Sequence, residues 1–135
     1  MVENIPDKTT KLMKPRRYSR HPQTANTGYI VKGRVWVEKN GELYLGWGHI
    51  QLLENIEKLG SIASAARAMN LGYRNAWLWV DAMNRLAPSL LVEKSTGGAS
   101  GGYAKLTEEA HKAIKYYKNL HDKLQKFLKT NNQEA

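Results

Sequence analysis

Cysteine is absent from this 135-residue sequence, and its absence excludes disulfides, thiolate metal sites and a cysteine nucleophile. No apolar run approaches the roughly 18 residues of a membrane-spanning helix, so we expect none. The first residues are polar and basic, unlike the apolar core of a signal peptide, and we expect a cytoplasmic protein. Acidic residues are also few, because 12 Asp and Glu stand against 21 Lys and Arg, a formal net charge of +9.

This surplus of positive charge favours a polyanionic partner, with nucleic acid first and an acidic membrane surface second. The alternative is that the lysines only keep the surface soluble. A hydrophobic content of 41% is enough for one core, and the length predicts one domain with extensions.

The two ends of the sequence look like extensions of that domain. Residues 1–28 hold three of the four prolines and the cluster Lys14-Pro15-Arg16-Arg17, and they show neither helical nor strand periodicity. We interpret them as a basic flexible arm that either adds phosphate contacts or has no role. The polar tail 131–135 is expected to fray.

Between the ends, apolar spacing and turn residues predict the order hairpin, three helices, hairpin, long helix. The predicted ranges are a hairpin at 30–45 around Asn40-Gly41, helices at 47–59, 61–69 and 73–86, a second hairpin at 90–106, and a helix from Thr107 to about Leu128. This order predicts an α+β fold, mainly α: a winged helix-turn-helix with an N-terminal β-hairpin and a long C-terminal helix. The DNA-binding domain would cover 29–106, and a dimerisation helix would cover 107–130.

The helix at 73–86 is the predicted recognition helix, which would lie in the major groove of DNA. Ala76, Val80 and Met83 form its core stripe, and the opposite side carries Tyr73, Arg74, Trp77, Leu78 and Asp81. Arg74 can donate two hydrogen bonds to guanine, and Asn75 can pair with adenine. Tyr73 would contact a phosphate or a sugar, and Leu78 also faces the DNA.

Each of these assignments has a plainer alternative. Arg74 could contact only phosphate or remain solvated, Asn75 lies beside the core stripe, and Trp77 is more typical of core or hairpin packing. Asp81 would repel phosphate, so we expect it to orient a basic neighbour such as Arg85 at i+4.

Two further segments offer hydrogen-bond donors to the DNA backbone. Ser61 and Ser64 open the helix at 61–69, whose free N–H groups could hold a phosphate, although simple capping is the alternative. The glycine-rich tip at 95–102 lies between two strands, so it suits a wing better than a nucleotide-phosphate loop. Its predicted contacts are Ser95, Thr96, Gly97 and Gly98, and the alternative is a turn that touches nothing.

The last predicted helix carries a heptad-like apolar seam whose members are Leu106, Ala110, Ala113, Tyr117, Leu120, Leu124 and Phe127. We expect Ala113, Tyr117, Leu120, Leu124 and Phe127 to form a homodimer interface that would suit a palindromic operator. Packing of the seam onto the first hairpin, or a combination of both, is the alternative.

The sequence offers little to catalysis or cofactor binding. His111 and His121 are ten residues apart on one predicted helix, too far to share a metal ion. No acidic cluster suits two-metal catalysis, and no serine lies in a nucleophile-elbow sequence. We therefore expect no enzyme, no cofactor and no metal site, with all four histidines at the surface or in capping positions.

Four segments of the middle region carry a specific pattern: Leu59-Gly60-Ser61-Ile62-Ala63-Ser64-Ala65-Ala66-Arg67-Ala68-Met69, Leu71-Gly72-Tyr73-Arg74-Asn75-Ala76-Trp77, Asp81-Ala82-Met83-Asn84, and Leu91-Val92-Glu93-Lys94-Ser95-Thr96-Gly97-Gly98 with Gly101-Gly102 and Leu106-Thr107. Over roughly 30–120, the sequence resembles the N-terminal DNA-binding domain of the molybdate-responsive (ModE) regulator family. The Gly-Ser-Ile-x-x-Ala-Ala part alone is also similar to LysR-type regulators.

The resemblance implies a winged-helix dimer on a palindromic operator, with Tyr73, Arg74 and the wing near the DNA. Three departures from the family pattern matter. Gly72 replaces a serine cap, Ala99-Ser100 stands where a wing lysine is common, and no molybdate-binding domains follow the last helix, so molybdate is not expected as a ligand. A sequence-specific regulator is the favoured function, and a non-specific nucleoid-type DNA or RNA binder or a protein-interaction module are the alternatives.

Overall fold

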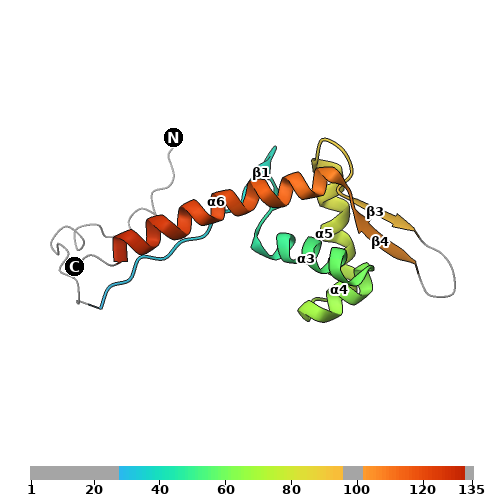
Figure 1. Ribbon diagram of the computed structural model, residues 1–135, viewed down its shortest axis with the longest axis horizontal. Coiled ribbons are helices and arrows are strands. Elements are labelled where there is room, and N and C mark those ends of the chain that lie inside the picture. The colour runs from blue at the N-terminus through green and yellow to red at the C-terminus, as the bar shows by residue number, and fades with distance from the viewer. Residues whose placement is uncertain (1–27, 96–101, 133–135) are drawn as a thin grey trace, which may run out of the picture. The chain divides into compact units, whose positions relative to one another are not determined.

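The computed structural model describes residues 28–95 and 102–132, so most of the predicted arm, the wing tip and the tail lie outside the described residues. The elements in chain order are β1 (Val37–Lys39), β2 (Glu42–Leu45), α3 (Trp47–Leu59), α4 (Ile62–Met69), α5 (Tyr73–Leu86), β3 (Val92–Ser95), β4 (Tyr103–Leu106) and α6 (Glu108–Asn132) (Figure 1). The predicted α+β, mainly α fold is confirmed. The chain divides into a larger unit at 33–125 and a smaller one, described at 28–32 and 126–132.

The first hairpin is confirmed but is shorter than predicted. Strands β1 and β2 pair antiparallel, with Lys39 opposite Glu42, and the turn between them has left-handed Asn40 and Gly41 at φ 52° and 82°. A two-residue turn with both φ values positive matches the twist of the strands. The predicted hairpin range of 30–45 begins too early, because β2 ends at Leu45, just before α3, and offers no partner to residues 30–36.

Backbone turns set the boundaries of the three central helices where the sequence predicted them. Gly60, at φ 83°, ends α3 and donates its N–H to Ile56. Asn70, at φ 60°, ends α4, and the Leu71 N–H bonds the Ala66 carbonyl across the same turn at 2.9 Å. Leu71 then packs against the core, as a hydrophobic residue after a left-handed cap commonly does.

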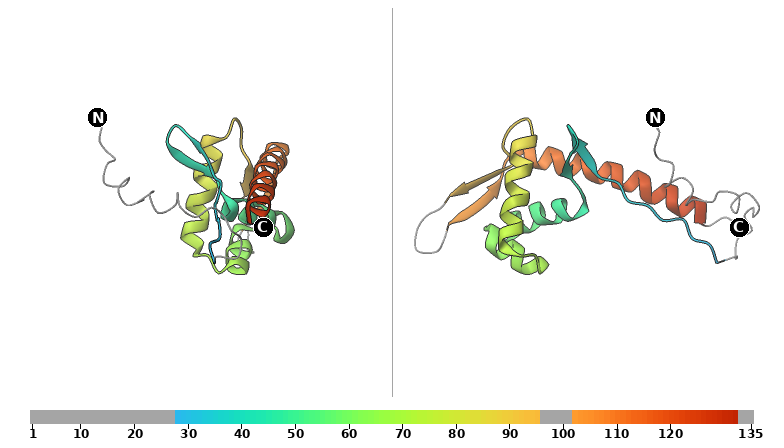
Figure 2. Two further views of the ribbon diagram at one scale, coloured as in Figure 1. Left: turned by 90° about the vertical axis from the view of Figure 1, so that its left-hand side faces the viewer. Right: turned by 180° about the vertical axis from the view of Figure 1, so that it is seen from behind.

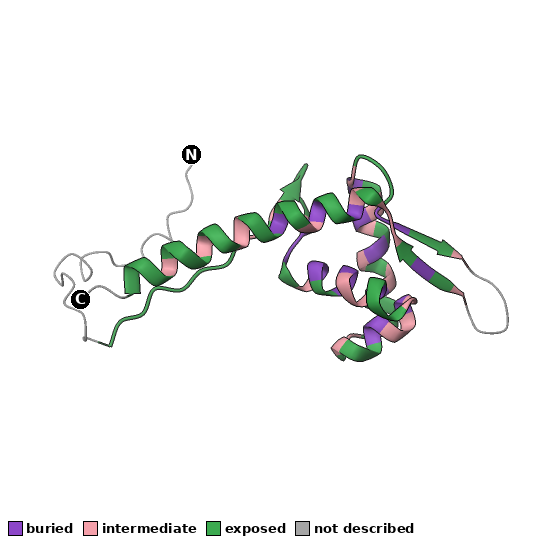
Figure 3. Ribbon diagram, viewed as in Figure 1, coloured by how far each residue is buried: buried purple, intermediate pink, exposed green. Residues whose placement is uncertain are grey.

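The core of the larger unit lies where α3, α4, α5, the base of the β3–β4 hairpin and the first part of α6 meet (Figure 3). Its fully buried large side chains include Leu45, Ile50, Leu52, Leu53, Ile56, Val80, Met83, Leu91, Val92 and Tyr117. The Tyr117 hydroxyl also donates a hydrogen bond to the Val35 carbonyl at 2.7 Å, which fixes the segment before β1 against α6.

The long helix α6 starts as predicted and ends later. The Thr107 hydroxyl accepts the Ala110 N–H at 3.2 Å, and Glu108 and Glu109 add negative charge to the first turn. Buried residues within α6 are confined to Ala110, Ala113 and Tyr117. The helix extends to Asn132, four residues beyond the predicted Leu128.

In the smaller unit, the side-chain amide of Asn132 bonds the backbone of Val31 twice. It accepts the Val31 N–H at 2.9 Å and donates to the Val31 carbonyl at 3.0 Å. This side-chain pairing satisfies both backbone groups of Val31, which lies outside the observed strands. Among the described helices, none combines the length and apolar character that crossing a membrane requires.

Candidate nucleic-acid interface

Helices α4 and α5 form a helix-turn-helix, and the β3–β4 hairpin that follows them extends away from α3, α4 and α5 (Figure 2). The helix α5 has the two faces that its sequence predicted. Ala76, Val80 and Met83 are buried, whereas Tyr73 and Leu78 remain 54% and 53% exposed. The opposite face of α5 is therefore available to a partner.

The polar residues at the start of α5 lie on this exposed face. Arg74 and Asn75 are both exposed in the first turn of the helix. Tyr73 packs edge-on against the half-buried Trp77, with ring centroids 6.0 Å apart and an interplanar angle of 81°. The position of the phenol is thus fixed by a neighbour one helical turn away.

The positive charge on this face of α5 has no acidic residue near it in the sequence. No Asp or Glu occurs between Glu57 and Asp81, a stretch that includes all of α4 and the first half of α5. Within the described ranges Arg74 forms no ion pair. An unpaired guanidinium on an exposed helix face, with no carboxylate nearby in sequence, favours contact with an anion.

The predicted pairing of Asp81 with Arg85 is wrong. Asp81 accepts a hydrogen bond from Lys94 on β3 at 2.7 Å, and the same ammonium lies 4.7 Å from the centre of the Trp77 ring. Arg85 instead pairs with Glu42 on β2 at 2.8 Å, and this hydrogen bond lowers the pKa of the Glu42 carboxyl. Asp81 and Arg85 thus each bond a residue of a neighbouring hairpin, and sequence spacing within one helix does not reveal such partners.

The base of the wing is bonded directly to α5 through Asn84. The Asn84 side-chain oxygen accepts the N–H groups of Leu91 and Val92 at 2.8 and 3.0 Å, and its amide donates to the Val92 carbonyl at 3.1 Å. Helix α5 and the base of the β3–β4 hairpin are therefore fixed to each other. Ser95 ends β3 and is half-buried, and the predicted contacts Thr96, Gly97 and Gly98 lie outside the described residues.

The two serines at the start of α4 have defined partners. The Ser61 hydroxyl accepts the Ser64 N–H at 3.0 Å, so Ser61 caps the helix. The Ser64 hydroxyl accepts a hydrogen bond from Arg67 at 3.3 Å. Arg67 is exposed and adds a second positive charge to the helix-turn-helix. Both hydroxyls keep their own proton for donation to an anion.

The predicted dimer seam of α6 divides into two parts. Ala113 and Tyr117 are 7% and 1% exposed because they belong to the core of this chain, where the first turns of α6 cover α3 and the base of the β3–β4 hairpin. Little of either side chain is left to contact a second copy. Leu120 and Leu124 are half-buried, and Phe127 is 58% exposed.

The prediction that every histidine is a surface or capping residue is wrong for His49, which is 8% exposed, caps no helix and stacks on Trp79 with ring centroids 4.5 Å apart. Burial lowers the pKa of the His49 imidazole. His111 pairs with Glu57 at 2.6 Å, and His21 lies outside the described residues. No group of three metal-ligating side chains occurs in the part of the chain that the structure describes.

No family model matches the sequence. Its relatives include the transcriptional regulator ModE of Haemophilus influenzae, with 36% identity over 75 residues, which are 56% of this chain and 29% of the relative. The DNA-binding transcriptional dual regulator ModE of Escherichia coli K12 is 40% identical over 68 residues, 50% of this chain and 26% of the relative. The molybdenum-pterin-binding protein MopA of Rhodobacter capsulatus is 38% identical over 92 residues, 68% of this chain and 35% of the relative.

The chain thus spans 26 to 35% of the length of these three proteins. The matched part covers half to two-thirds of the chain, which agrees in extent with the resemblance that the sequence motifs predicted. Fold and similarity agree: the matched part of this chain is similar to a ModE-type N-terminal domain.

Proposed function

We propose that this chain is a DNA-binding regulator of transcription, with α5 as its recognition helix in the major groove. The single observation that carries the proposal is the start of α5. Arg74 lies there exposed, without an ion-pair partner in the described residues, on a helix-turn-helix whose nearest acidic residues in sequence are Glu57 and Asp81. The similarity to the E. coli and H. influenzae relatives, a DNA-binding transcriptional regulator and a transcriptional regulator, supports it.

In this proposal, sequence is read by the first turns of α5. Arg74 donates two parallel hydrogen bonds to a guanine, and Asn75 pairs with an adenine. Leu78, one turn further on, offers an exposed apolar surface to a thymine methyl group. Tyr73, whose ring packs edge-on against Trp77, contacts a phosphate or a sugar.

Contacts to the DNA backbone fix the position of α5 in the groove. Ser61 and Ser64 with the start of α4 hold one phosphate, and Ser95, Thr96, Gly97 and Gly98 contact another through the wing. The hydrogen bonds of Asn84 keep the base of the wing at a constant distance from α5, so both contacts are made together.

We also propose that the active form is a homodimer on a palindromic operator. Ala113 and Tyr117 are buried in the core of this chain. The part of the apolar seam of α6 that is still accessible consists of Leu120, Leu124 and Phe127. An exposed seam at heptad spacing is buried most simply against an identical helix.

The test is selection of DNA from a random duplex library, read by sequencing at one fixed salt concentration. Enrichment of a palindrome supports a sequence-specific dimeric regulator. Equal retention of every duplex overturns it in favour of a non-specific nucleoid-type binder. Weak binding with little salt dependence would instead favour a winged helix that binds proteins.

A further inference from the structure

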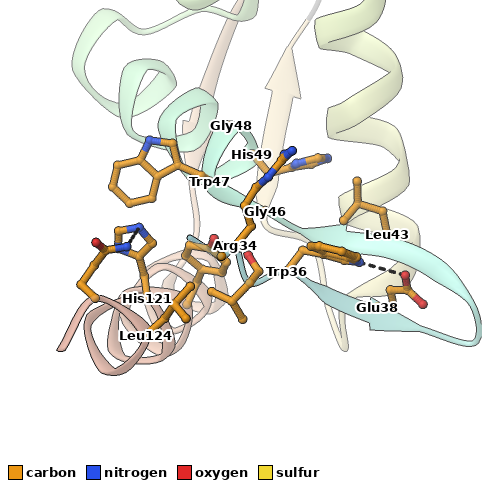
Figure 4. A pocket seen from close by; sticks show the side chains of 14 residues that line it. Arg34, Trp36, Glu38, Leu43, Gly46, Trp47, Gly48, His49, His121 and Leu124 are labelled. Atoms are coloured by element: carbon orange, nitrogen blue, oxygen red, sulfur yellow. Dashed lines mark hydrogen bonds between the residues drawn. The ribbon is translucent and has the colours of Figure 1, made fainter. Parts of the chain in front are cut away.

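A cavity of about 620 Å³ lies in the larger unit, and no residue of α5 lines it (Figure 4). Its walls come from the segment before β1, the start of α3 and the middle of α6. The charged, polar and aromatic side chains of its lining include Arg34, Trp36, Trp47, His49, Tyr117 and His121. A volume of this size falls within the range of about 300–1,000 Å³ that is typical of small-molecule sites.

His49 is a buried polar side chain that lines this cavity, and it has no hydrogen-bond partner among the described residues. Only 8% of its surface is exposed, and its ring stacks on Trp79. Because burial lowers the pKa of the imidazole, the ring is neutral near pH 7 and has one donor and one acceptor nitrogen. Buried polar groups are nearly always bonded, so these nitrogens point to a ligand.

The cavity also carries positive potential. Arg34 is exposed, and its guanidinium forms no ion pair within the described ranges; in Figure 4 it extends toward the start of α3. There Gly46 caps the helix without any side-chain bond, and the first turn holds no acidic residue. Free N–H groups at a helix start favour an anion.

One acidic group, Glu38, lines the same cavity, and it is already bonded. Its carboxylate accepts the indole N–H of Trp36 at 2.9 Å, on the side of the cavity opposite to His121 (Figure 4). Glu38 therefore forms no ion pair with Arg34, and the guanidinium remains able to bind an anion.

Flat aromatic surfaces make up much of the remaining lining. Trp36 and Trp47 are 54% and 45% exposed, although large indoles gain free energy when they are covered. Trp47 stacks on His121 with ring centroids 4.3 Å apart, and this contact holds the indole in place at the cavity wall. A planar ring would find a stacking surface here.

We propose that this cavity binds a small aromatic carboxylate. Its ring packs against an exposed indole, its carboxylate bonds Arg34 and the free N–H groups at the start of α3, and a polar atom of the ligand bonds His49. The site does not depend on the proposed DNA binding, since none of the groups named belongs to α4, α5 or the wing.

The test is isothermal titration calorimetry of the full chain with 2-naphthoate as the probe and neutral 2-naphthamide beside it. We expect saturable binding of the acid and at least about tenfold weaker binding of the amide. Arg34→Gln should weaken naphthoate binding about tenfold or more, because a charge-assisted hydrogen bond is lost. Arg67→Gln removes the same charge from α4 and should leave the affinity unchanged.

His49→Phe keeps the ring stack on Trp79 and removes the two nitrogens, so it should weaken binding about three- to tenfold. Circular dichroism shows whether this variant folds, and Arg34→Gln, at an exposed position, tests the proposal independently. Absence of saturable binding up to millimolar naphthoate overturns it, as does equal binding of acid and amide. Sedimentation in parallel identifies the remaining case: a self-associated protein that does not bind naphthoate would assign the cavity to a second copy.

Discussion

The side chain of Asn84 is bonded to Val92 at both of its backbone groups, accepting the N–H at 3.0 Å and donating to the carbonyl at 3.1 Å. A third bond, from the Leu91 N–H, completes the set at 2.8 Å. A single amide thereby takes the place of a strand neighbour at the start of β3. The proposed recognition helix and wing are consequently held in one arrangement before any DNA binds.

Asn84→Ala should lower the free energy of unfolding by about 2–3 kcal/mol, because it leaves two N–H groups and one carbonyl without their partner. Urea unfolding followed by circular dichroism measures the loss. Asn55→Ala is the matched control, since the Asn55 amide bonds only the Gln51 carbonyl on its own helix. It should change stability by less than about 0.5 kcal/mol. Equal effects of the two substitutions would contradict the role of Asn84.

Gly72→Ser should stabilise the protein by about 0.5–1.5 kcal/mol. Gly72 has φ −61° and ψ 140°, which any residue adopts, and an added Cβ would come no closer than 3.7 Å to Asn75. The serine hydroxyl could then accept an N–H group of the first turn, which now has no side-chain cap. Gly72→Ala restricts the unfolded chain similarly but cannot cap, so thermal unfolding should rank serine above alanine by about 1 kcal/mol.

The free energy of unfolding should decrease as the pH is lowered, and His49 should account for part of this decrease. Its pKa is lowered in the folded protein, so below the ordinary value of about 6.5 the unfolded chain takes up a proton that the buried ring accepts only at lower pH. The contribution is fully present above pH 6.5 and is lost as pH falls through the folded pKa. His49→Phe should flatten the stability curve between about pH 7 and 5. Parallel curves for the two proteins would show that burial does not shift this titration.

Phe127→Glu should weaken self-association at least about tenfold, because it places a charge in the proposed seam of α6. Sedimentation equilibrium measures the dimer–monomer constant. Tyr116→Glu provides the control, since Tyr116 is similarly exposed, at 54% against 58%, but lies outside the seam. A wild-type chain that stays monomeric at micromolar concentration and above would refute the homodimer.

Local sequence signals predicted much of the fold. Gly60 and Asn70 take left-handed conformations that few residues tolerate, so the ends of α3 and α4 could be located from the sequence. The exposed and buried faces of α5 followed from helical periodicity, with Ala76 and Val80 inside and Arg74 outside.

What the sequence did not predict depends on contacts between distant segments. Asp81 pairs with Lys94 on β3 and not with Arg85 on its own helix. Tyr117 is buried because residues far earlier in the chain, such as Val35, cover it. His49 is buried on α3 against Trp79 of α5, and its position three and four residues before the buried Leu52 and Leu53 is the signal that could have located it. Such pairings depend on packing in three dimensions, which one-dimensional spacing does not encode.

The most direct test of the central claim compares Arg74→Ala with Arg85→Ala on the duplex enriched by selection, at one salt concentration. Both residues are exposed arginines of α5, but Arg85 is paired with Glu42 and Arg74 has no ion-pair partner in the described residues. If α5 reads bases, Arg74→Ala should weaken binding about 10- to 100-fold and relax one position of the site, while Arg85→Ala changes affinity less than about twofold. Equal losses for both variants, or wild-type affinity for Arg74→Ala, would contradict the account.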